Sequence, residues 1–167
     1  PNTRSRPVRR ADSLSFSLAL SLYGAGCAAR AAALYLRLKG TYSAANVAAT
    51  GLGCAADLKG DDPRRVALLE TLEKASRDTL DDAKIPLSGD DRSGLYESLI
   101  GARESMKDEA GALSLRQQWA TFLAGEAAKA KTPEQRADYD PHRLGAYVAL
   151  NQPEKAIPML EQSETDF

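Results

Sequence analysis

The stretch from Leu144 to Ile157, LGAYVALNQPEKAI, gives the clearest indication of the fold. It has the pattern of a helix end, a short polar turn at Asn151-Gln152, and a second helix whose first position is taken by Pro153. Two earlier stretches, which begin at Gly60 and Lys107, have the same order of a polar turn, a small or β-branched residue and an apolar residue. The sequence therefore predicts three similar junctions between helices.

The three junctions recur at a nearly constant spacing. Val66, Ala112 and Ala156 occupy equivalent positions in them and are 46 and 44 residues apart. Small residues at such positions let two antiparallel helices approach closely, and helix pairs that recur at this period are typical of helical-repeat proteins. We therefore expect an all-α fold of antiparallel helix pairs stacked on one another.

Composition favours helices along all 167 residues, because 29 Ala and 22 Leu stand against four Val and three Ile. The net charge of −1 gives no overall basic surface for nucleic acid, so we expect no nucleic-acid partner. One His and two Cys are few for a metal site or a catalytic triad. We expect no catalytic residue, no metal and no cofactor.

Helix start and stop signals divide the chain into about seven helices. Thr132, Pro133 and Gln135 form the strongest start signal, a cap followed by Pro at the first position and a capping box. Asp62 is a further expected cap. In the helix that follows it, a stripe of Val66, Leu69 and Leu72 should be buried. The first three helices are expected at 13–38, 44–59 and 63–81, and the fourth follows a cap at Asp90 or Asp91. The fifth is expected at 109–131, the sixth at 133–150 with a restart at Asp140-Pro141, and the seventh from Pro153 onward.

The last helix pair resembles a tetratricopeptide (TPR) repeat over about 25 residues. Tyr147 matches the aromatic position of that repeat, Ala156 matches its small position, and Leu160 lies where an aromatic side chain is common. The resemblance implies a single TPR-like repeat domain at 13–167. It also implies a stacked helical surface that binds another protein or a peptide.

The stretch from Asp90 to Phe167 resembles a helical region that accompanies the thioredoxin domain of some bacterial proteins. Those proteins carry a redox Cys-x-x-Cys, which this sequence lacks, so the resemblance does not transfer their oxidoreductase activity. The sequence stops just after a repeat's second helix and has no polar capping helix. This ending is typical of a fragment of a longer chain.

The first 27 residues have two interpretations. Four arginines within 1–12, an uncharged stretch at 13–29 and small residues before Cys27 form the outline of a bacterial export signal, with Cys27 as a lipid-anchor site. The serines that interrupt this stretch favour the other interpretation, a basic disordered tail at 1–12 that leads into the first helix. The stretch is short for a membrane span, and localisation stays open between bacterial cytoplasm and periplasm.

Cys27 and Cys54 are equidistant from the expected turn at Gly40-Thr41. Antiparallel helices would place them at the same level, which makes them a candidate redox pair in an exported protein. The Ala-rich surroundings favour another interpretation, in which the two cysteines are small apolar side chains buried in a helix interface.

Five side chains are candidates for a partner groove, and helical spacing also favours core packing for the two tyrosines. The sequence identifies no nucleophile near His142, so we expect this residue at the solvated start of a helix and not as a general base. The five candidates are Tyr96, Arg103, His142, Arg143 and Tyr147.

Three pairs of adjacent aspartates lack the alternate-residue spacing of a calcium loop. They fall at expected helix ends, where carboxylates cap backbone N–H groups. We therefore expect caps at Asp61-Asp62, Asp81-Asp82 and Asp90-Asp91.

The function that these observations favour is a non-catalytic protein–protein interaction or scaffold module built from TPR-like helical repeats. The alternative is an accessory helical region of an exported bacterial thioredoxin-family protein, in which Cys27 and Cys54 form the redox pair.

Overall fold

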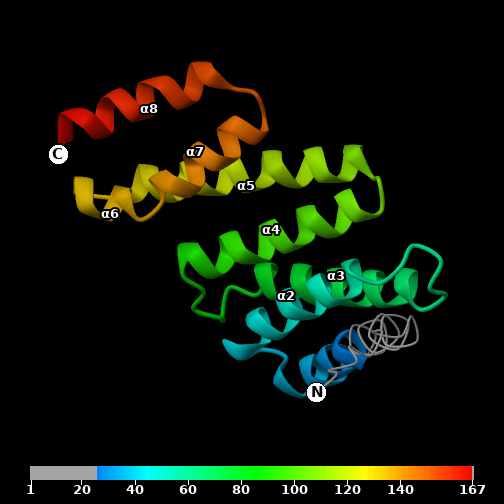
Figure 1. The fold of residues 1–167 in the computed structure, drawn as a ribbon. Helices are drawn as coiled ribbons and strands as arrows, with labels where there is room; N and C mark the ends of the chain where they lie inside the picture. The colour runs from blue at the N-terminus through cyan, green and yellow to red at the C-terminus, as the bar shows by residue number, and fades with distance from the viewer. Residues whose placement is uncertain (1–25, 167) are drawn as a thin grey trace, which may run out of the picture.

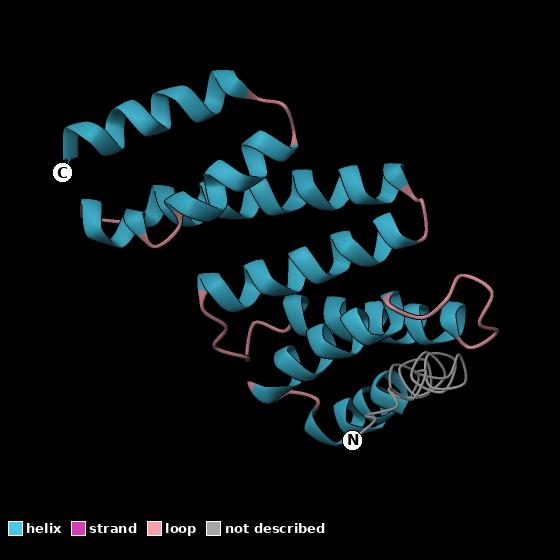
Figure 2. Cartoon of the chain, in the orientation of Figure 1, coloured by secondary structure: helices cyan, strands magenta, loops and turns pink. Residues whose placement is uncertain are grey.

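The computed structural model describes residues 26–166, and all regular structure in this range is helical, with no strand (Figures 1 and 2). The all-α prediction is confirmed. The export-signal interpretation depends mainly on residues before 26 and lies outside the described range. A helix at 26–38 is followed by α2 (Ser43–Ala56), α3 (Arg65–Asp81), α4 (Gly89–Ser105), α5 (Glu109–Lys129), α6 (Pro133–Ala137), α7 (Asp140–Ala149) and α8 (Pro153–Asp166).

The described helices pack as pairs of chain neighbours. Helix α2 packs against α3, α4 against α5, and α7 against α8, and the last two pairs are joined by short connections (Figure 1). Contacts of α2 with α4 and of α5 with α7 join one pair to the next. This part of the chain has eight helices where seven were expected, because α6 and α7 are separate at the predicted restart.

The core is built from leucines that lie between the helices, with alanines where helices cross closely. Leu69 and Leu72 of α3 are fully buried, as expected. Val66 is 57% exposed, so that part of the predicted stripe is wrong. The buried face of α3 passes through Arg65, Leu69 and Leu72, and Val66 lies beside it on the outer surface. The fully buried leucines are Leu52, Leu69, Leu72, Leu95, Leu99, Leu115 and Leu123.

Two of the three predicted junctions have the same backbone geometry. Lys107 and Asn151, 44 residues apart, both have a positive φ, of 60° and 52°. The next N–H in each turn donates five residues back: Asp108 to the carbonyl of Arg103, and Gln152 to that of Tyr147, both at 2.9 Å. The junction after Gly60 lacks this arrangement, because α2 already ends at Ala56 and a longer connection follows.

The cap predicted for the third helix is wrong. Helix α3 begins at Arg65, two residues later than expected, and its N-cap residue Arg64 makes no side-chain capping bond. Asp62 instead closes the preceding turn, since its carboxylate accepts from the Arg64 N–H at 2.9 Å. The residues Asp62-Pro63 therefore form a turn before α3 and do not begin the helix.

Ser88, and not Asp90 or Asp91, is the N-cap of α4. Its hydroxyl accepts from the Asp91 N–H at 3.1 Å, and the Asp91 carboxylate accepts from the Ser88 N–H at 2.9 Å. This reciprocal pair is a capping box, and it satisfies backbone donors that the first helical turn cannot. Helix α4 therefore begins at Gly89, before both of the aspartates that were expected to cap it.

Removing the Ser88 hydroxyl should destabilise the protein measurably. We expect Ser88→Ala to lower the free energy of unfolding by about 0.5–2 kcal/mol, because the first turn of α4 loses its capping acceptor. The matched control is Ser88→Gly, for which a loss of only a few tenths of a kcal/mol is expected. Urea unfolding monitored by circular dichroism measures both variants. Equal stability of Ser88→Ala and wild type would contradict the assigned cap.

The start signal at Thr132 is confirmed in its main part. The Thr132 hydroxyl accepts from the Gln135 N–H at 3.3 Å, and Pro133 occupies the first turn of α6. The Gln135 side chain accepts from the Lys131 N–H at 2.9 Å, one residue before the position that a capping box requires. The reciprocal bond is therefore shifted by one residue.

Candidate interaction surface

The outward face of α5 carries two adjoining hollows. One, of about 470 Å³, lies between α5 and α4. The other, of about 480 Å³, lies where α5 meets the α7–α8 turn and α8. Because both are lined by Gln117 and Thr121, they form one continuous surface, which we call the α5 groove. Its lining residues are Tyr96, Ser114, Gln117, Gln118, Ala120, Thr121, Phe122, Ala124, Tyr147, Leu150, Gln152 and Lys155.

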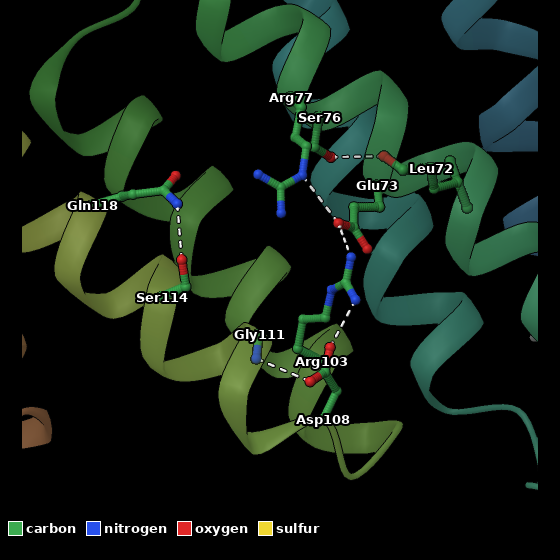
Figure 3. Close-up of polar contacts among 9 residues, drawn as sticks. All are labelled: Leu72, Glu73, Ser76, Arg77, Arg103, Asp108, Gly111, Ser114 and Gln118. Atoms are coloured by element: carbon green, nitrogen blue, oxygen red, sulfur yellow. Dashed lines mark hydrogen bonds and ion pairs between the residues drawn. The ribbon is translucent and has the colours of Figure 1, made fainter.

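The sequence of α5 explains why this face is polar. Leu115, Trp119 and Leu123 recur every four residues and are buried in the core. The opposite positions are uncharged polar residues. Thr121 donates its hydroxyl to the Gln117 carbonyl at 2.8 Å, and Gln118 donates to the Ser114 hydroxyl at 3.2 Å, as Figure 3 shows for the second pair.

Aromatic residues form the two walls of the groove. The Tyr96 ring lies 6.2 Å from that of Phe122, and burial together with the charge of Asp81 raises the pKa of the Tyr96 phenol. At the other wall Tyr147 is 6% exposed, and the Lys155 ammonium lies 5.8 Å from its ring centre. Both tyrosines thus pack against the core and also line the groove.

The other three predicted groove residues lie elsewhere and are engaged in ion pairs. Arg103 bridges Glu73 of α3 and the Asp108 carboxylate, the latter at 2.7 Å, so it joins three parts of the fold (Figure 3). Its hydrogen bond with Glu73 is the main reason why its pKa is raised. The contact with Glu73 was not visible in the sequence, because Glu73 lies 30 residues earlier in the chain.

His142 and Arg143 lie at the start of α7, as expected for His142. The His142 Nε2 is 2.9 Å from the Asp90 carboxylate, and its ring lies 6.3 Å from that of Trp119. Arg143 pairs with Asp140 at 2.7 Å. Neither side chain lines the α5 groove.

Cys27 and Cys54 form a disulfide that joins the helix at 26–38 to α2, with their Cα atoms 6.0 Å apart. The favoured interpretation of two separate buried thiols is therefore wrong, and the redox-pair interpretation gives the correct pairing. The reason is the hairpin at Gly40, where a φ of 81° ends the first described helix. The chain then reverses into α2, so that Cys54 lies level with Cys27. A disulfide is consistent with an oxidising compartment, and one sulfur cannot carry both this bond and a lipid anchor.

The acidic pairs lie near helix ends, as expected, but among them only the Asp91 side chain takes part in a helix cap. Asp82 accepts from the Lys84 N–H at 3.0 Å, and Asp91 belongs to the capping box of α4. Hydrogen bonds from the Arg64 side chain, followed by the one from its backbone, lower the pKa of Asp62 to about 2. This carboxylate therefore favours the folded state above its ordinary pKa of 3.8, and that contribution is lost as the pH falls toward 2.

The pKa of Asp62 provides a test of this turn. We expect Arg64→Ala to return it toward the ordinary value of 3.8, because the guanidinium bonds to both carboxylate oxygens are removed. Carboxyl-detected NMR titration between pH 1.5 and 6 measures the change, on the order of one pKa unit. Lys59→Ala removes a nearby cation that makes no such bond and should leave the pKa low. A low pKa in Arg64→Ala would contradict the assigned contact.

Among residues 26–166, no helix is long and apolar enough to cross a membrane. The same range holds no group of three or more His, Cys, Asp or Glu side chains arranged to bind a metal ion. No protein-family model, curated protein sequence or solved structure matches this chain.

Proposed function

We propose that this chain is a non-catalytic protein-interaction module of TPR-like helical repeats, and that the α5 groove is its peptide-binding surface. The observation that carries the proposal is the groove itself, because it spans the junction between two helix pairs. Surfaces formed between stacked helix pairs present side chains from several helices to one extended ligand.

The two equivalent turns support the repeat part of the proposal. They lie 44 residues apart, and the small residues that follow them, Ala112 and Ala156, are both buried against the core. Small side chains at these positions allow close packing of the two helices in a pair, as in TPR repeats. In this proposal α4–α5 and α7–α8 are successive repeats, and α2–α3 is a divergent one.

A random peptide library displayed on phage tests the proposal. The full chain is immobilised, enriched peptides are synthesised, and their affinities are measured by fluorescence anisotropy. Thr121→Arg should weaken binding at least about tenfold, because the long side chain fills the shared part of the groove. Ala128→Arg, on an exposed position of the same helix outside the groove, is the matched control.

Two results would count against the module. Enrichment of no peptide above background would remove the proposed function. Equal binding by Thr121→Arg and Ala128→Arg would place the binding surface away from the α5 groove.

The second candidate function is an accessory helical region of an exported bacterial thiol-redox protein. The Cys27–Cys54 disulfide favours it, since such bonds persist mainly in oxidising compartments. In the native host, the two thiols should react with a maleimide reagent only after reduction. Two thiols that react in the unreduced, denatured protein would exclude this function.

A further inference from the structure

The α5 groove has a charge pattern that differs from the rest of the chain. The sequence has 23 acidic residues, yet none of them is among the residues that line the groove. Lys155 supplies the one formal charge of this lining. The lining of the groove is therefore uncharged along α5 and has a positive charge at its α8 end.

Lys155 is available for a partner's negative charge. Within residues 26–166 no carboxylate lies within ion-pair distance of its ammonium group, whereas Lys74, Lys129 and Arg64 all pair with acidic side chains. Its neighbour is the Tyr147 ring, 5.8 Å away. A cation held over an aromatic ring keeps its remaining N–H donors free for an anionic ligand.

The rest of the groove offers donors and acceptors suited to a peptide main chain. Gln117, Gln118 and Thr121 are exposed along α5. Gln152 makes no side-chain hydrogen bond in the described part of the chain, and its Oε1 atom is buried without a partner. Amide side chains both donate and accept, as a peptide backbone requires.

We propose that the α5 groove binds an extended acidic peptide, whose main chain contacts the amide and hydroxyl side chains of α5 and whose carboxylate pairs with Lys155. This inference rests on the proposed interaction function and specifies its partner. The aromatic walls at Tyr96 and Tyr147 accept the apolar parts of the same segment.

The test reads the charge of the peptides that the full chain selects from a randomised decapeptide library. Wild type should enrich Asp or Glu at one position. Lys155→Glu should lose that preference and weaken the binding of a synthetic selected peptide at least about tenfold, because opposite charges become like charges. Lys131→Glu makes the same charge change at an exposed site outside the groove and should leave affinity within about twofold.

The outcomes separate the two proposals. Selected peptides without an acidic preference, or affinities equally affected by Lys155→Glu and Lys131→Glu, would overturn the acidic-peptide inference and leave the interaction module standing. No selected peptides at all would overturn both. Near-ultraviolet circular dichroism of each variant verifies that the fold is retained.

Discussion

The Cys54→Ala variant is expected to unfold with a free energy about 2–4 kcal/mol below that of oxidised wild type. The disulfide closes a loop between residues 27 positions apart and ties the helix at 26–38 to α2. Cross-linking of this kind restricts the unfolded chain and so raises the relative stability of the folded state. Without it, the first described helix is held by the packing of Ala28 and Ala31 and of the buried Tyr35.

Guanidinium unfolding monitored by the fluorescence of Trp119, the single tryptophan, measures this loss. Its indole donates to the Ser93 hydroxyl at 3.0 Å in the core, so emission reports on the folded state. Dithiothreitol should destabilise wild type by a similar amount and leave Cys54→Ala unchanged. A wild type equally stable with and without dithiothreitol would contradict a stabilising disulfide.

The second large effect is expected at Gly51, where α2 crosses its neighbours. A Cβ atom there would lie 2.6 Å from a Leu72 methyl carbon and 2.8 Å from the Ala31 Cβ. Leu72 is fully buried and has no free space to move into, and the Ala31 Cβ cannot rotate away. We expect Gly51→Leu to lower the free energy of unfolding by about 3 kcal/mol or more, because the helices at 26–38 and 65–81 must separate from α2.

Gly53 provides the matched control on the same helix. It is exposed, and a Cβ atom there would have no heavy atom within 4 Å. Gly53→Leu should therefore raise stability by about 0.5–1 kcal/mol, since Leu favours a helix more than Gly does. Thermal unfolding of both variants, followed by circular dichroism, separates packing from helix propensity. Similar effects of the two substitutions would show that Gly51 is not a close crossing point.

Contacts between side chains on different helices could not be predicted from the sequence. Arg103 was expected in a groove, but it pairs with Glu73, which lies 30 residues earlier and on another helix. Tyr96 and Tyr147 pack against the core, as helical spacing favoured, and both also line the α5 groove. Gln117 and Thr121, the centre of the α5 groove, carried no motif and could be found only as the polar face opposite Leu115 and Trp119.

Local signals in the sequence predict the helices and most of their ends. Alanine and leucine content, the Gly40 stop and the Thr132 start act within about four residues, where the chain's own geometry fixes which groups meet. Tertiary structure decided which distant residues meet: the bond between Cys27 and Cys54, the exposure of Val66, and the groove across α5. These depend on how deeply each helix is packed and how it is rotated about its axis, and many helices together set those two quantities.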